Sequence, residues 1–82
     1  MALDELKNAA KVIGTKQVIK QLTNGEVRKI YIAGDAEPHV IEPIKELCRQ
    51  KHIEIEIAES MQILGRAVGI EVGSATVALL ND

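Results

Sequence analysis

Apolar residues recur along this chain with two different spacings, and the two patterns alternate. Apolar positions three or four residues apart, typical of amphipathic helices, occur in four segments: 3–10, 15–24, 38–51 and 60–68. Short apolar or strictly alternating runs, typical of strands, lie between them: 11–13, 27–33, 53–57 and 74–80. This order predicts an α/β fold, a three-layer α/β/α sandwich around a mixed central sheet of about four strands. With 82 residues and no linker or repeat, the chain is expected to form a single domain, residues 1–82.

Residues that favour helix ends stand at the predicted boundaries. Thr15 is expected to be the N-cap of the second helix, and Asn24-Gly25 to end it. The acidic residues Asp35 and Glu37 suit the positive end of a helix dipole. The remaining boundary and core expectations are Pro38 in a first helical turn, Ser60 as the cap of the fourth helix, and two inward-facing sets: Val18, Ile19 and Leu22, then Met61, Leu64 and Val68.

Two of the predicted strands differ in their expected surroundings. The run from Val27 to Ala33 is apolar in its later half, as expected for a strand covered by helices on both faces. The run from Ile53 to Ile57 alternates strictly with glutamate, which predicts an edge strand with one exposed acidic face. Such a polar edge is compatible with a monomer, which is the expected state.

Composition narrows the function classes. The net charge of −2 argues against binding nucleic acid through a broadly basic surface, so any such site must be local. The only aromatic residue is Tyr31, which leaves few platforms for stacking single-stranded bases. No segment reaches the roughly 20 apolar residues needed to span a membrane. A soluble cytoplasmic protein is expected.

Metal, redox and catalytic chemistry find little support in the sequence. Cys48 lies at core spacing and is expected to be a buried, reduced thiol. His39 and His52 have no partner at metal-ligand spacing. Asp35 and Glu37 could form a carboxylate pair for acid–base chemistry, but the helix start already explains them. We therefore expect no metal, no cofactor and no enzymatic activity.

Two segments have residue patterns that point to a ligand. In "GTKQVIK", residues 14–20, Lys16 and Lys20 lie one helical turn apart, and Gln17 can donate to and accept from base edges. Backbone N–H groups at the start of this helix can hold a phosphate. In "LGRAVGIEVGSA", residues 64–75, apolar residues stand between glycines where loops are normally polar. Taken alone, these segments are also compatible with a solvated helix face and with ordinary core.

Together with "YIAGDAEP" (residues 31–38), the two segments resemble the kink-turn RNA-binding family of ribosomal-protein-like domains, and most closely its short bacterial YbxF-type members. The resemblance implies an RNA-binding protein that recognises a sharply bent RNA helix beside tandem sheared G·A pairs. Gly14, Lys16, Gln17 and Lys20 match family positions that reach the G·A pairs and flanking phosphates. Ile70, Glu71 and Val72 match the loop that covers a nucleotide extruded at the bend. With Thr15 and Arg66, which stand beside them, these residues make up the expected RNA-binding site.

The sequence departs from the archaeal and eukaryotic pattern of that family. An Asn-Glu pair there is replaced here by Lys16 and Gln17, and a lysine cannot accept a hydrogen bond. The resemblance leaves the target open between ribosomal RNA, a riboswitch and another structured RNA. The alternative function is a protein-interaction module that uses the apolar loop 68–73 as its anchor.

Overall fold

The computed structural model describes residues 10–70 and 72–80, which form four strands and three helices. In chain order these are β1 (Lys11–Ile13), α2 (Thr15–Asn24), β2 (Val27–Ala33), α3 (Pro38–Lys51), β3 (Glu54–Ala58), α4 (Met61–Ala67) and β4 (Thr76–Leu80). Residues 3–9 of the helix predicted over 3–10 lie outside the described residues, and Ala10, the last residue of that prediction, is not helical. The other predicted elements are confirmed, although β3 is shifted by one residue and β4 begins two residues later than expected.

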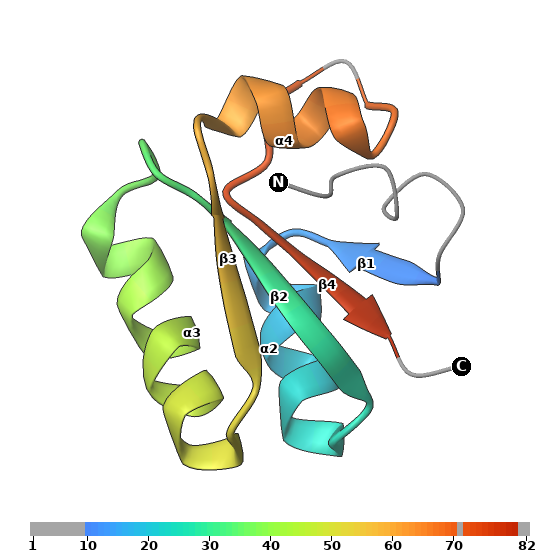
Figure 1. Cartoon of the computed structure of the whole chain (residues 1–82), viewed down its shortest axis with the longest axis vertical. Coiled ribbons are helices and arrows are strands. Elements are labelled where there is room, and N and C mark those ends of the chain that lie inside the picture. Colours follow the sequence, from blue (N-terminus) through green and yellow to red (C-terminus); the bar gives the residue numbers. More distant parts are fainter. Residues whose placement is uncertain (1–9, 71, 81–82) are drawn as a thin grey trace.

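The sheet has the order β1-β4-β2-β3, and β4 runs antiparallel to both of its neighbours. Since β3 pairs with β2 in parallel, the sheet is mixed, as predicted. Strands β1, β2 and β3 therefore all end at the edge where β4 begins (Figure 1). The first residues of α2, α3 and α4 follow those strand ends, so all three helices begin at this end of the molecule.

The core lies between the sheet and helices α2 and α3. Residues Ile30 to Ala33 of β2 are all fully buried, in agreement with the prediction for this strand. Val18 and Leu22 of α2 and Ile44 of α3 are buried in the same cluster. Helix α4 packs at one end of β2, β3 and β4, where Leu64 is fully buried. The predicted α/β sandwich around a four-stranded sheet is confirmed.

Three expectations about helix ends need correction. The N-cap of α2 is Gly14, with φ of 100°, so Thr15 is the first helical residue rather than the cap. Glu37 is the N-cap of α3, but the Asp35 carboxylate instead accepts a hydrogen bond from the backbone N–H of Met61, at 2.8 Å. Met61 is exposed rather than inward-facing, because it occupies the first position of α4 at the molecular edge. Ser60 caps α4 as predicted, with its Oγ 3.1 Å from the N–H of Ile63.

Cys48 is buried on the inner face of α3, as predicted, and burial raises the pKa of its thiol to about 11. The thiolate is the reactive form, so little of it is present at neutral pH. We expect the native protein to react with iodoacetamide at pH 8 roughly a hundredfold more slowly than the same protein unfolded in guanidinium. Equal rates in the two states, measured by mass spectrometry, would contradict this.

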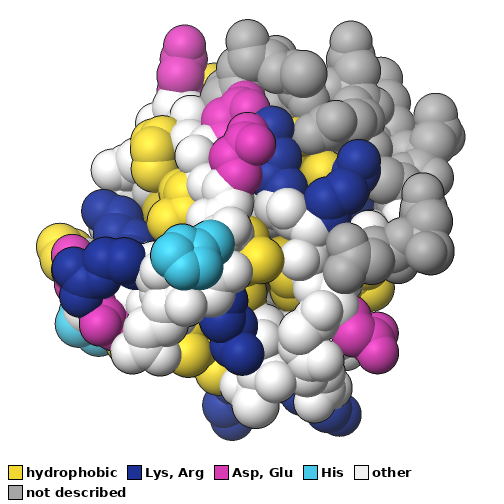
Figure 2. Space-filling view, turned by 60° about the horizontal axis from the view of Figure 1, so that its bottom comes forward, with side chains coloured by type: hydrophobic (Ala, Val, Ile, Leu, Met, Phe, Trp, Pro, Cys, Tyr) yellow, Lys and Arg dark blue, Asp and Glu magenta, His cyan; other side chains and the backbone are white. Residues whose placement is uncertain are grey.

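Surface charges at the end opposite the helix starts are mixed in sign. Figure 2 turns this end forward and shows basic and acidic side chains interspersed, without a broad area of one sign.

No helix among the described residues is long and apolar enough to cross a membrane.

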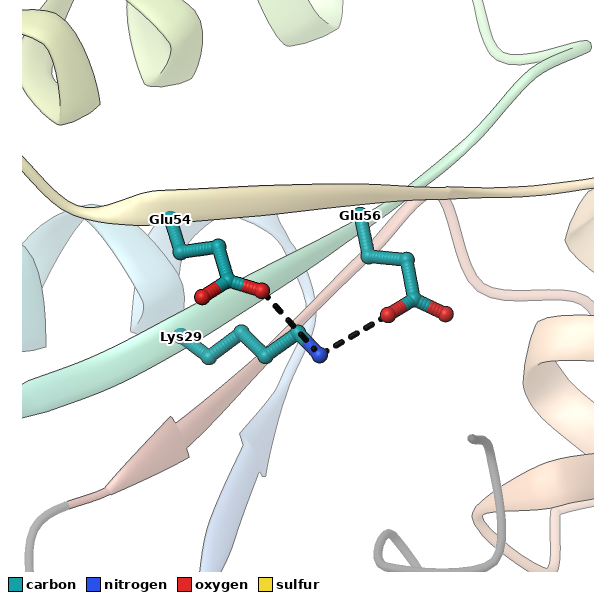
Figure 3. A network of polar contacts seen from close by, with 3 residues as sticks. All are labelled: Lys29, Glu54 and Glu56. Atoms are coloured by element: carbon teal, nitrogen blue, oxygen red, sulfur yellow. Dashed lines mark hydrogen bonds and ion pairs between the residues drawn. The ribbon is translucent and has the colours of Figure 1, made fainter. Parts of the chain in front are cut away.

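Strand β2 carries a polar cluster that the sequence pattern does not indicate. Lys29 Nζ lies 2.8 Å from Glu56 Oε1 and 3.4 Å from Glu54 Oε2, both on β3 (Figure 3). The ammonium group also lies 5.0 Å from the centroid of the Tyr31 ring. Strand β3 is at the sheet edge, as predicted, but only part of its acidic face is exposed, since the Glu56 side chain is 23% exposed.

Candidate nucleic-acid interface

The first candidate segment forms the start of α2. Strand β1 ends at Ile13, and Gly14 takes a positive φ that turns the chain directly into the helix. Val18 and Leu22 bury the inner face of α2. The side chains predicted to contact RNA lie on the opposite, exposed side: Lys16, Gln17 and Lys20.

The N-termini of α2 and α4 differ in how their N–H groups are satisfied. At α4, both the Ser60 hydroxyl and the Asp35 carboxylate accept hydrogen bonds from the first turn. At α2, no side chain among the described residues caps the helix, and the first turn contains no acidic residue. A helix N-terminus carries about half a positive charge. Because Thr15 does not cap it, this end of α2 can bind an anion with its own backbone.

The second candidate segment folds back against α4. The helix ends at Ala67, Gly69 adopts φ of 85°, and the N–H of Ile70 donates to the carbonyl of Gly65 at 3.0 Å. A Cβ on Gly65 would overlap the carbonyl oxygen of Val72, and one on Gly73 would lie 3.0 Å from Met61 Cβ. These glycines are therefore required where the backbone of the loop touches the helix.

The loop presents apolar side chains at its surface. Val72 is 71% exposed, which rules out ordinary core packing for this residue, while Ile70 is half-buried. Arg66 is exposed in the last turn of α4. Glu71, the remaining residue of the predicted loop site, lies outside the described residues.

The two segments meet at one backbone carbonyl. The Thr76 carbonyl accepts a hydrogen bond from the N–H of Gly14, at 3.2 Å, and another from the Ser74 hydroxyl, at 2.9 Å. Ser74 and Thr76 are both buried. Nothing in the sequence singles out either residue, because a serine and a threonine beside an apolar strand show no distinctive spacing.

Within the described part of the chain, no group of three His, Cys, Asp or Glu residues could hold a metal ion. The groups that this end of the molecule offers to a ligand are instead cationic side chains, the backbone N–H groups at the start of α2, the side-chain amide of Gln17 and an exposed apolar loop. Such a surface can bind phosphates and base edges and can cover an apolar or aromatic group.

Similarity to known proteins identifies the family of this chain. The model of the ribosomal protein L7Ae/L30e/S12e/Gadd45 family matches residues 2–82. RNA-binding protein TTE2299 of Caldanaerobacter subterraneus is 48% identical over 68 residues, which cover 83% of each chain. RNA-binding protein YbxF of Geobacillus stearothermophilus is 37% identical over 82 residues, which cover 99% of this chain and 100% of that protein.

The fold is also found among solved structures. The 15.5kD RNA binding protein of Giardia lamblia matches with a TM-score of 0.91 at 24% identity, over 98% of this chain and 71% of that chain. At this identity the match concerns the fold alone. The resemblance to short bacterial YbxF-type proteins is confirmed by the relatives above. The chain belongs to the ribosomal protein L7Ae/L30e/S12e/Gadd45 family.

Proposed function

We propose that this protein binds structured RNA as a monomer in the cytoplasm, and that its target is a kink-turn, a sharply bent helix with tandem G·A pairs. The observation that carries the proposal is that the start of α2, which no described side chain caps, and the apolar loop 68–73 lie at one end of the sheet, where Gly14 and Ser74, the residue after the loop, donate to the same Thr76 carbonyl. Relatives that align over most of the chain are named RNA-binding proteins. Ribosomal RNA and riboswitch RNA are both candidate targets.

Local rather than overall charge supports the binding of phosphates. The chain has 10 basic and 12 acidic residues, so it has no general attraction for nucleic acid. At the start of α2, however, the exposed lysines Lys16 and Lys20 add to the positive end of the helix dipole. Phosphate contacts fix the position of a protein on RNA, and Gln17 beside them adds a group that can read base edges.

The loop supplies an apolar surface for a base that has left the stack. A base extruded at a bend needs a partner for its exposed face, and Val72 together with Ile70 can cover one without an aromatic ring. A protein that binds only the bent conformer shifts the equilibrium between extended and bent RNA by its differential affinity. Recognition of this kind requires no bond chemistry.

The first experiment is a titration of the protein into two labelled RNAs at physiological salt. One RNA contains a kink-turn, and the other has its G·A pairs replaced by Watson–Crick pairs. We expect binding to the first that is at least about a hundredfold tighter, since specific recognition exceeds nonspecific binding by several kcal/mol. Equal binding to both RNAs, or to neither, would contradict the proposal.

Two kinds of substitution should separate phosphate binding from base readout. Replacing Lys16 or Lys20 by alanine should weaken binding and reduce the slope of log Kd against log salt by about 1 for each phosphate that the protein no longer neutralises. Gln17→Ala should leave that slope unchanged and reduce the discrimination between the two RNAs. Arg49→Ala on the exposed face of α3, far from this site in sequence, is the control for general charge. An equal effect of Arg49→Ala would argue against local phosphate contacts.

The exposure of Val72 also favours one alternative, a protein partner anchored on the loop 68–73. That function predicts that Val72→Ser abolishes partner binding with little salt dependence, whereas the lysine substitutions have no effect.

A further inference from the structure

The buried hydroxyl of Ser74 bonds to the same backbone carbonyl as Gly14, a residue of the first half of the proposed site. Residues 14–20 and 68–73 are more than 45 positions apart in the sequence, so local structure cannot fix one relative to the other. Their alignment depends on contacts that cross from β1 and α2 to the segment between α4 and β4. The Thr76 carbonyl provides such a contact, since it accepts from Gly14 on one side and from Ser74 on the other.

Ser74 is also bonded to α4. Its backbone N–H donates to the carbonyl of Met61 at 3.0 Å, while the N–H of Met61 donates to Asp35. Ser74 is only 4% exposed, so water does not compete for these hydrogen bonds. One residue therefore links the first turn of α4 to the start of α2 through two short bonds and a shared carbonyl.

We infer that Ser74 is a positioning residue for RNA binding, whose hydroxyl holds the apolar loop in a fixed place relative to the start of α2. This inference rests on the proposed function. An RNA that must touch both segments binds more tightly when they are already aligned, because less conformational freedom is lost on binding. Without the hydroxyl, the Thr76 carbonyl keeps its bond from Gly14, so the sheet remains intact while the loop loses one of its attachments.

Thr76 offers a matched control in the same segment. Like Ser74 it is buried, but its Oγ1 has no hydrogen-bond partner among the described residues. Thr76→Val removes a buried hydroxyl, preserves the shape of the side chain and leaves the carbonyl in place. Ser74→Ala removes a buried hydroxyl that does make a bond. The two variants differ in the one feature to which the inference assigns a role.

The test compares the wild type, Ser74→Ala and Thr76→Val in two measurements. Without RNA, amide hydrogen exchange should become roughly threefold to tenfold faster at Gly69, Ile70, Val72 and Gly73 of Ser74→Ala, the effect expected from losing one hydrogen bond. At Gly14, which keeps its bond to the Thr76 carbonyl, exchange should stay near the wild-type rate. Exchange in Thr76→Val should stay within about twofold of the wild type. With kink-turn RNA, Ser74→Ala should bind roughly threefold to tenfold more weakly, and Thr76→Val should bind like the wild type. Thermal unfolding of both variants confirms that they are folded at the assay temperature.

The outcomes distinguish this inference from the function on which it rests. If the wild type binds the kink-turn RNA and Ser74→Ala binds it equally well, the positioning role is wrong and the proposed function stands. Equal weakening by Thr76→Val would also overturn the role, because any buried hydroxyl would then have the same effect. If the wild type binds neither RNA, the proposed function fails, and the positioning role fails with it.

Discussion

The Gly65→Ala variant is expected to bind kink-turn RNA about tenfold or more weakly than the wild type, while the fold remains intact. Gly65 lies buried in α4, where an added Cβ would overlap the carbonyl oxygen of Val72. Either the helix or the loop must move. The helix has a side-chain cap at Ser60 and the buried Leu64 to hold it, so we expect the loop to be displaced. Displacement by about 1 Å is enough to lose well-aligned contacts to an RNA.

The variant should lose some stability but remain folded. Overpacking costs typically about 1–3 kcal/mol, but alanine stabilises a helix interior by about 0.5–1 kcal/mol relative to glycine. The net decrease in the free energy of unfolding should therefore be about 1–2 kcal/mol. The measurements are RNA titration and chemical denaturation of the same preparations.

Gly69→Asn is the matched control within this loop. A Cβ at position 69 would meet nothing within 4 Å, and asparagine tolerates the positive φ of 85° better than most residues. It should therefore lower RNA affinity by no more than about twofold. If Gly69→Asn and Gly65→Ala weaken binding equally, general loosening of the loop rather than the contact at Gly65 is responsible. If Gly65→Ala binds the kink-turn RNA as tightly as the wild type, the loop 68–73 is not part of the RNA-binding interface.

The strands and helices can be predicted because each one has a characteristic pattern of buried positions, one face in the helices and both faces in β2. The spacing of Val18 and Leu22 marks the buried face of α2, and the continuous apolar run from Ile30 to Ala33 marks a strand buried on both sides. The prediction at Thr15 is wrong because threonine and glycine are about equally favoured as N-caps, so residue preference alone does not choose between two neighbouring positions. In this protein the chain must turn from β1 into α2 within one residue. Only the positive φ available to Gly14 achieves this.

Contacts between distant segments cannot be predicted in the same way. The sequence position of Asp35 indicates the start of α3, yet its carboxylate bonds to Met61, 26 residues further on. The hydrogen bond from the Ser74 hydroxyl to the Thr76 carbonyl matters because Gly14 donates to the same carbonyl. Only the order of the strands in the sheet brings Gly14 close to Thr76. Likewise, the exposed state of Val72 depends on where the loop packs, and the alternation of apolar residues with glycines does not determine this.

Lys29→Met should have the largest effect on stability, a decrease of about 2–3 kcal/mol in the free energy of unfolding. Side chains of Lys29 and Glu56 are 16% and 23% exposed, so the pair lies mostly out of water. Removing one member of a buried pair leaves the other charge without compensation, at a cost of about 3–5 kcal/mol when burial is complete. Partial exposure here justifies the lower figure. For a domain of this size the midpoint of thermal unfolding should fall by about 10 °C or more.

A second and a third variant test whether the pair is responsible. Lys29→Met combined with Glu56→Leu should recover most of the lost stability, because the uncompensated carboxylate is removed as well. Arg49→Met removes the partner of Glu46 in an exposed pair on α3 and should cost less than about 0.5 kcal/mol. If Lys29→Met costs no more than Arg49→Met, the cluster contributes little and the assignment is wrong.

The pH dependence gives an independent check on Lys29. Its hydrogen bond to Glu56 raises the pKa of Lys29 above the ordinary lysine value, against a smaller opposing effect of burial. A group whose pKa is raised in the folded state contributes stability that is complete below its unfolded pKa, about 10.4 for lysine, and is lost as the pH rises through the folded value. The difference in unfolding free energy between wild type and Lys29→Met should therefore be constant from about pH 6 to pH 9 and decrease above about pH 10.5. A difference that already decreases between pH 6 and pH 9 would mean that a group other than Lys29 controls it.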